Sequence, residues 1–163
     1  MGKVQRRERW NQDAYNARFA WLYPYFYLAP EAAINDVNAV DLIPIEAGTI
    51  YLMNKGYVDY WRLYNRIDRQ GAFFIKRAKD NMKYRVEASY NVDNNTGVIS
   101  DEYIWLTAVI VAKDYPDIMR LVIHEDFSTE NVYRFLTNGF DHEAIIIAEL
   151  YREYWQVNFS SNG

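Results

Sequence analysis

The chain contains no cysteine among its 163 residues, and only two of them are histidine. Disulfide bonds and cysteine-based zinc sites are therefore excluded, and His124 and His142 are too few for a histidine-rich metal site. No apolar run approaches the roughly 20 residues that a membrane helix needs. The basic first residues do not lead into the apolar core of a secretory signal. These absences predict a cytoplasmic protein without a membrane partner.

Positive and negative charges are unevenly distributed along the chain. The net charge of −4 is the wrong sign for a generic DNA-binding domain. Residues 54–91, however, carry nine Lys or Arg and four Asp or Glu, a net of +5, whereas residues 92–163 carry four and twelve, a net of −8. The basic middle is either a face that binds phosphates or an ordinary solvated surface, and composition alone leaves both open.

The hydrophobic content is that of a folded domain. Half of the residues are hydrophobic and 17% are aromatic. Tyr and Trp fit pleated, half-buried sheet surfaces, so core packing explains the aromatics better than a platform for stacking nucleic-acid bases. At this length one domain with a substantial core is expected.

The first two expected helices precede residue 45. Residues 8–22 have apolar side chains at three- and four-residue spacing, which predicts a helix. A shorter helix is expected to begin at Asp36, a suitable N-cap, and to end near Pro44.

A strand, a helix and a second strand follow within about 30 residues. The apolar run 49–53 predicts a buried strand, and residues 58–69 predict a helix with Gly71 just past its end. The run 72–77 predicts the next strand. This order is typical of a parallel β-α-β unit.

The remainder predicts a block of antiparallel strands closed by a helix. Strands are expected at 83–92, 98–112, 118–125 and 132–137, with a hairpin turn at 93–97 between the first two. A helix is expected over 141–157 with Asp141 as its N-cap, followed by a tail at 159–163. The predicted fold class is therefore α/β, in its α+β form.

Three ordered stretches of the sequence resemble one known family. They are 36–41, then 51–60 with 71–81, and finally 135–138 with 147–157. Together they resemble the cut-and-paste insertion-sequence transposases of the DDE type, over about residues 35–158. The resemblance implies a partial RNase H-like core at 34–158 with a β insertion at about 83–137. Residues 1–33 match nothing in that family and are expected to form a separate helical segment.

The resemblance also implies where catalytic groups would stand. Such transposases hold two Mg²⁺ ions with three acidic side chains. One is an Asp directly before Lys-Gly-Tyr, and that position is Asn54 here. Another is a Glu in a helical pattern of Tyr, Arg, Glu and Lys, of which Tyr151 is retained, whereas Tyr154 stands for Arg and Asn158 for Glu. The sequence ends before the Lys, and no strand with the first acid is recognisable upstream of Asp36.

No intact catalytic acid is therefore expected, and no bound cofactor. An asparagine amide can ligate a cation but brings no charge to offset the loss of the cation's water. If this register is wrong, Asp59, Asp80 and Glu153 are the available carboxylates. The first two stand beside basic residues, which favours surface ion pairs.

Three functional interpretations follow. The favoured one is a shortened, catalytically inactive relative of transposases with at most weak, non-specific DNA binding by six basic residues, Lys55, Lys76, Arg77, Lys79, Lys83 and Arg85. The second is a structural or interaction protein, natural or engineered, that reuses the scaffold. The third is an active metal-dependent nuclease. The missing first strands would leave a sheet edge unpaired, so either the N-terminal helix or a second copy, in a homodimer, is expected to cover it.

Overall fold

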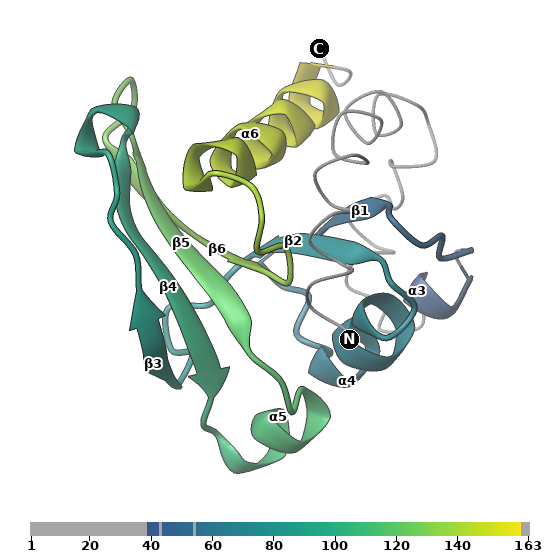
Figure 1. Ribbon diagram of the computed structural model, residues 1–163. Helices are drawn as coiled ribbons and strands as arrows, with labels where there is room; N and C mark the ends of the chain where they lie inside the picture. Colours follow the sequence, from purple (N-terminus) through teal and green to yellow (C-terminus); the bar gives the residue numbers. More distant parts are fainter. Residues whose placement is uncertain (1–38, 43, 54, 161–163) are drawn as a thin grey trace.

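The computed structural model describes residues 39–42, 44–53 and 55–160, with side chains up to Arg152. One six-stranded mixed sheet, in the order β1-β2-β6-β5-β4-β3, forms the centre of this α+β fold (Figure 1). The elements are α3 (Ala39–Leu42), β1 (Ile50–Met53), α4 (Tyr60–Arg62), the π-helical η2 (Leu63–Asp68), β2 (Phe73–Arg77), β3 (Tyr84–Ser89), the 3-10 turn η3 (Asn94–Thr96), β4 (Val98–Leu106), α5 (Val109–Asp114), β5 (Met119–Asp126), β6 (Asn131–Thr137) and α6 (Ala144–Ser160). No described helix combines the length and the apolar character needed to cross a membrane.

The predicted β-α-β unit is confirmed. β1 and β2 pair in parallel, with Ile50 opposite Phe73 and Met53 opposite Lys76. Phe73, Phe74 and Ile75 are all buried, as expected for a strand that is covered on both faces. Gly71 follows the helical segment with a φ of 79°, the left-handed conformation that ends many helices.

The antiparallel block is present, but its second strand is shorter than predicted. The expected strand 98–112 is wrong beyond Leu106, because residues Val109–Asp114 form helix α5. The amide of Thr107 donates to the carbonyl of Lys83, and β5 first pairs with β4 at Met119. Beyond Thr107 no strand among the described residues lies beside the chain, and the aliphatic run satisfies its backbone within helix α5.

The last helix also begins later than predicted. Asp141 is not its N-cap, since α6 starts at Ala144. The guanidinium of Arg120 donates to the carbonyls of Gly139 and His142, at 3.3 and 2.6 Å. Because this side chain holds the loop in place, the helix can begin only after the loop. α6 runs to Ser160, which includes two residues of the expected tail. The predicted helix 8–22 lies outside the described residues.

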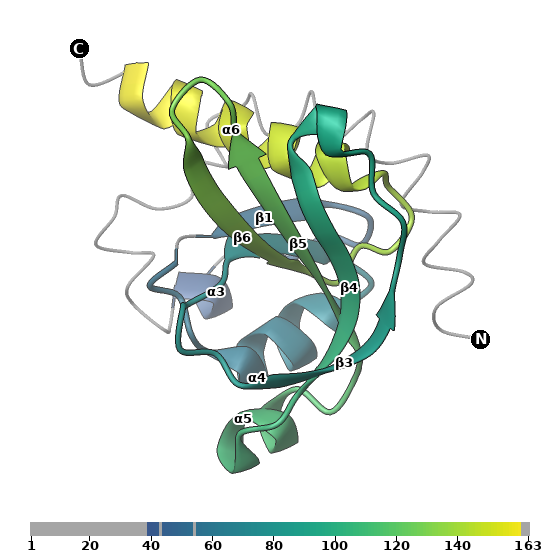
Figure 2. The same ribbon diagram turned by 90° about the vertical axis from the view of Figure 1, so that its left-hand side faces the viewer.

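The helices cover opposite faces of the sheet. Figure 2 shows α6 over one face, and α4 with α5 on the other side. One core cluster, between the sheet and the segment α4–η2, includes Leu63, Phe74 and Leu136. The other, between the sheet and α6, includes Ile75 and Ile147. The sheet is therefore the middle of three layers at its β1–β2 end.

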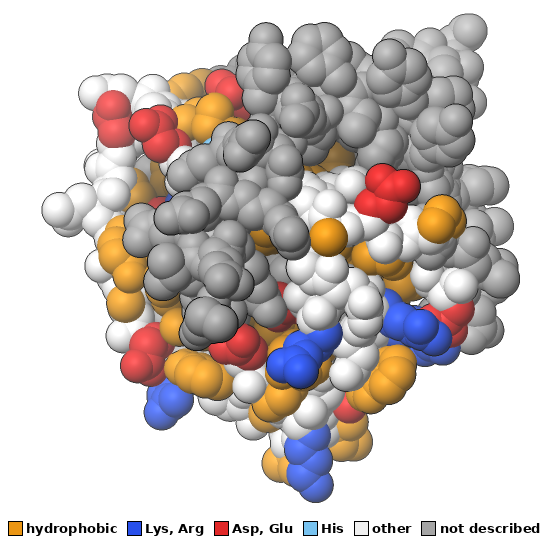
Figure 3. Space-filling view, turned by 45° about the vertical axis from the view of Figure 1, so that its right-hand side comes forward, with side chains coloured by type: hydrophobic (Ala, Val, Ile, Leu, Met, Phe, Trp, Pro, Cys, Tyr) orange, Lys and Arg blue, Asp and Glu red, His pale blue; other side chains and the backbone are white. Residues whose placement is uncertain are grey.

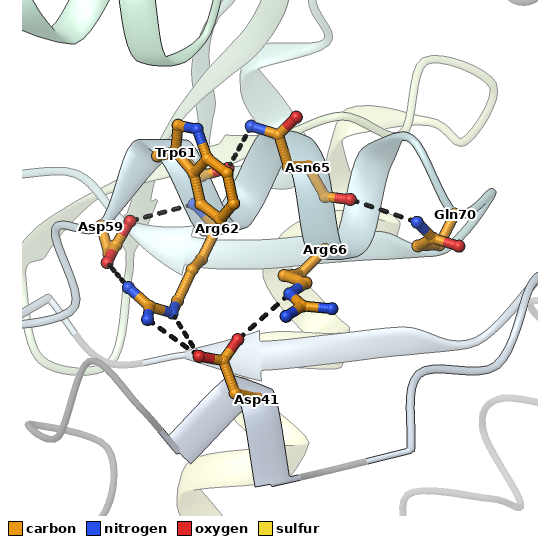
Figure 4. A network of polar contacts seen from close by, with 7 residues as sticks. All are labelled: Asp41, Asp59, Trp61, Arg62, Asn65, Arg66 and Gln70. Carbon is orange, nitrogen blue, oxygen red and sulfur yellow. Dashed lines mark hydrogen bonds and ion pairs between the residues drawn. The ribbon is translucent and has the colours of Figure 1, made fainter.

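An ion-pair network joins α3 to α4. Arg62 donates to Asp41 at 2.8 Å and to Asp59, the N-cap of α4, at 2.6 Å (Figure 4). Arg66 also reaches Asp41, at 3.1 Å. The hydrogen bonds from Arg62 lower the pKa of Asp41 below its ordinary value. The short helix before Pro44 is thus held beside the helix of the β-α-β unit.

Buried polar side chains attach the end of β6 to β2. The amide oxygen of Asn138 accepts from the backbone NH of Phe74 at 2.9 Å, and its nitrogen donates to the carbonyl of Ala72 at 3.1 Å. The hydroxyl of Thr137 donates to the carbonyl of Phe74 at 2.6 Å. Asn138 thus continues the β-sheet hydrogen bonding after β6 has ended, and it does so where only 1% of the residue is exposed.

We predict that Asn138→Ala lowers the free energy of unfolding by about 2–4 kcal/mol, because two buried backbone groups of β2 lose their partners. Asn131→Ala, at an exposed position of β6, is the matched control and should stay within about 0.5 kcal/mol of the parent. Urea unfolding followed by tryptophan fluorescence measures both. Equal stabilities of the two variants would contradict this role of Asn138.

Candidate functional site

The site lies where β1 ends beneath α6. The hydroxyl of Tyr151 donates to the carbonyl of Met53 at 3.1 Å, and Tyr151 is only 2% exposed. α6 therefore carries its motif tyrosine directly to the strand end that precedes position 54 in the sequence. Asn54 itself lies outside the described residues, as do the side chains of Tyr154 and Asn158.

A pocket of about 600 Å³ opens beside Tyr151. It lies between α6 and the sheet, and is closed at one end by the turn from β5 to β6. Its apolar wall comes from Phe135 on β6 and from Ile145 and Ala148 on α6, and Phe127 in the turn reaches its edge. A cavity of this size, with an apolar wall and polar side chains beside it, is typical of a binding site.

Aromatic rings form one continuous wall of this pocket. The guanidinium of Arg77 lies 5.0 Å from the ring centre of Tyr133, which stacks on Phe135 at 6.0 Å. Phe135 in turn contacts the ring of Tyr151 at 5.0 Å. Arg77 is thereby held by a cation–π contact at the pocket instead of extending freely into solvent.

A carboxylate links the turn to α6 at the pocket. Asp126 accepts hydrogen bonds from the backbone NH and hydroxyl of Ser128, at 2.9 and 2.6 Å, and from Arg152 at 3.1 Å. The Ser128 contacts, followed by Arg152, lower the pKa of Asp126 to about 2. Asp126 is therefore ionised at neutral pH.

A glycine in the turn between β3 and β4 lies against the end of β5 beside the pocket. Gly97 has a φ of 88°, and a Cβ at this position would lie 2.4 Å from the carbonyl oxygen of Glu125. Only glycine allows the two strands to approach this closely. The turn predicted at 93–97 is therefore confirmed.

The six basic residues singled out from the sequence do not share one environment. Lys79, Lys83 and Arg85 are exposed, and Arg77 is half-buried. Lys55 forms an ion pair with Asp80 at 3.2 Å. Lys76, the sixth, is fully buried, so it is not available to a phosphate in this arrangement.

Lys76 is buried because β2 is covered on both faces. Alternation along an ordinary surface strand would expose every second residue, but β2 lies between β1 and β6 with helices above and below. The Nζ of Lys76 donates to the carbonyl of Arg77 at 2.8 Å and lies 5.9 Å from the ring centre of Tyr60. Burial, with smaller contributions from Lys79 and Lys55, lowers the pKa of Lys76 to about 8.

Two of the three alternative carboxylates are engaged in ion pairs, and the side chain of the third, Glu153, lies outside the described residues. Asp59 caps α4 and binds Arg62, and Asp80 binds Lys55, as their basic neighbours in the sequence indicated. Within the described ranges, no group of three or more His, Asp or Glu side chains is arranged to hold a metal ion.

We predict that Lys76→Met raises the free energy of unfolding at pH 7 by about 2–3 kcal/mol, because it removes a desolvated charge. The unfolded chain holds the lysine proton up to its ordinary pKa, whereas the folded chain releases it near pH 8. The parent should therefore gain stability as the pH rises from about 8 towards 10.

The Lys76→Met variant should lack this gain, and the control Lys83→Met, at an exposed position that does not contribute to the lowered pKa of Lys76, should keep it. Urea unfolding at several pH values between 7 and 9.5 provides the measurement. Parallel pH profiles for the parent and Lys76→Met would contradict the buried-lysine account.

The comparisons with known proteins give one informative match. The chain is 30% identical over 132 residues to the protein named "Putative transposase y4zB" of Sinorhizobium fredii. The matched region covers 78% of this chain but only 36% of that protein. This chain thus spans about a third of its relative's length. No family model matches. No solved structure matches. In sequence, the chain is related over most of its length to a protein that bears the name of a transposase.

Proposed function

We propose that this chain is a transposase-related protein of the RNase H-like DDE type that does not catalyse transposition and retains weak affinity for DNA. The contact between the Tyr151 hydroxyl and the Met53 carbonyl carries this proposal. It brings together the two motifs that the resemblance pairs, the end of the strand before Lys-Gly-Tyr and the tyrosine of the last helix, although they are 98 residues apart in sequence.

The architecture supports the proposal in two further respects. A parallel pair, β1 and β2, precedes an antiparallel block, and a single long helix closes the chain over the same sheet. This is the order expected of a core with a β insertion before its last helix. The sequence relation to a transposase spans most of the same region.

The proposed loss of activity rests on side-chain chemistry. Asn54 and Asn158 stand where the resemblance requires acids, and Tyr154 stands where it requires Arg. Two neutral amides cannot offset the cost of dehydrating a pair of divalent cations. Asp59 is engaged with Arg62 as the N-cap of α4, and Asp80 forms an exposed ion pair with Lys55, so neither carboxylate stands in the place of these acids in the motif.

The proposed DNA contact uses the exposed cations that follow β2. Lys79, Lys83 and Arg85 lie on the connection from β2 to β3 and on β3 itself. Phosphate neutralisation by such residues releases counterions, so it gives affinity without sequence preference and a steep dependence on salt. The acidic second half of the chain opposes this binding wherever it faces the same DNA.

We predict that Lys79→Ala/Lys83→Ala/Arg85→Ala loses most of the affinity for a short DNA duplex at low salt. With three to five phosphate contacts, the parent should lose roughly two to three decades of affinity between about 50 and 200 mM salt. Fluorescence anisotropy across this range measures both effects.

A control variant with the same change of charge replaces exposed cations elsewhere, Arg66, Arg69 and Lys113, by Ala. It should bind DNA within about twofold of the parent. If both triple variants bind alike, the cations after β2 are only a solvated surface. If the parent itself shows no salt-dependent binding, the chain is instead a non-enzymatic scaffold protein.

The register of the proposed site has a separate test. Asn54→Asp with Asn158→Glu should place two carboxylates near the end of β1, which favours a bound cation. Thermal melting in Mn²⁺ and in chelator should show a larger metal-dependent shift for the double variant than for either single variant or the parent.

Strand transfer should not return in the double variant, because the first acid and the motif Arg are still missing. A metal shift of equal size in all four proteins would mean that positions 54 and 158 are not neighbours. The residue-by-residue assignment from the transposase family would then be incorrect.

A further inference from the structure

Two aliphatic side chains stand exposed at one end of the sheet. Val109 and Ile110, at the start of α5, are 74% and 75% exposed, although the next residue, Val111, packs against the core. Lys113 follows Ile110 by three residues and is also exposed, so it lies on the same side of the helix. We name Val109, Ile110 and Lys113 the α5 knob. Two adjacent aliphatic side chains exposed to this extent favour a contact with another apolar surface.

The pocket beneath α6 has the complementary character. Its wall is apolar, from Phe135, Ile145 and Ala148, and the aromatic ring of Phe127 stands 62% exposed at its edge. The carboxylates that line it belong to Glu125, Asp126 and Glu149. With Arg77 and Arg152 they give three negative and two positive groups, a net of −1 when histidine is neutral. This pocket fits an aliphatic group accompanied by a positive charge.

The knob and the pocket of one chain lie at opposite ends of the antiparallel block. In Figures 1 and 2, α5 is at the lower end of β4 and β5, and the turn between β5 and β6 is at their upper end beside α6. The strands between them are paired over their full length. A chain therefore cannot insert its own α5 knob into its own pocket without unfolding, but it can insert it into the pocket of another copy.

We propose that this protein self-associates by inserting the α5 knob of one copy into the α6 pocket of a second copy. Val109 and Ile110 then cover the apolar wall, and Lys113 meets the carboxylate of Glu125, which lines the pocket. The contact is independent of DNA binding and of any metal.

The geometry determines which assemblies are possible. Two different surfaces meet in this contact, so a copy that donates its knob still has an empty pocket. The contact therefore either repeats along a chain of copies or closes on itself in an antiparallel pair. Both assemblies contain the same interface, and both are removed by one change on either side of it.

Exposed positions allow the interface to be tested without disturbing the fold. Ile110→Asp places a negative charge on the knob, where it is repelled by the carboxylates of the pocket. Phe127→Lys places a positive charge at the edge of the pocket, where it is repelled by Lys113. Val132→Asp is the matched control: it is 52% exposed on β6 and projects to the face opposite Tyr133 and the pocket.

Sedimentation velocity over a wide range of protein concentration is the measurement, and circular dichroism verifies the fold of each variant. The parent and Val132→Asp should associate with increasing concentration. Ile110→Asp and Phe127→Lys should each weaken association about tenfold or more, since the burial of one aliphatic or aromatic side chain is lost.

A mixture of the two defective variants provides the decisive result. Ile110→Asp keeps an intact pocket and Phe127→Lys keeps an intact knob, so the mixture should form a one-to-one complex that neither variant forms alone. The proposal is overturned if the parent remains monomeric throughout, if Val132→Asp dissociates it equally, or if the mixture behaves as the sum of its two components.

Discussion

The position of α6 on the sheet depends on which groups hydrogen-bond to the backbone of β2 at the point where β6 ends. Beyond Thr137 the chain must turn away from the sheet, and this would leave the buried NH of Phe74 and the carbonyl of Ala72 unpaired. The side chain of Asn138 occupies that place and makes both hydrogen bonds. Arg120, which is also held by both carboxylate oxygens of Asp101 at 2.8 Å, then fixes the loop up to His142. The start of α6 is thus determined by polar contacts in the core.

The position of α6 decides what the molecule can do. From its start at Ala144 the helix crosses the sheet so that Tyr151 reaches the carbonyl of Met53 and Arg152 reaches Asp126. One contact completes the strand end where the transposase resemblance requires a metal ligand. The other closes the pocket beside it. In the proposed relation to transposases, this is the scaffold of a nucleic-acid enzyme, in which Asn54 and Asn158 stand at the positions of two acidic side chains.

The local sequence pattern correctly predicted the elements whose formation depends on residues close together in the sequence. The β-α-β unit followed from two apolar runs, an amphipathic segment between them and Gly71, and the structure agrees with it. The prediction of a strand over the aliphatic run 108–112 was wrong because its cause is not local. The β propensity of this run is strong, but no strand among the described residues lies beside it, so tertiary context selected a helix.

The parts that sequence could not supply depend on distant residues. Arg120 stands in an ordinary strand pattern, and neither Asp101 nor the loop that it holds is near it in sequence. The burial of Lys76 depends on two neighbouring strands and on both helical layers. The pocket arises between α6 and a turn about 20 residues earlier, and no single motif encodes it. Tyr151, in contrast, was predicted as a site residue from the family pattern; the structure shows its contact with the Met53 carbonyl, and its role in a site stays a prediction.

The last helix brings Tyr151 to the sheet beside the end of β1. A nuclear Overhauser experiment on the whole chain in solution measures this proximity directly. We expect cross-peaks between the ring protons of Tyr151 and those of Phe135, whose ring centres lie 5.0 Å apart. Cross-peaks from Tyr151 to protons at the end of β1 are expected as well. Cross-peaks from Tyr151 only to its neighbours along α6 would contradict this position of the helix on the sheet.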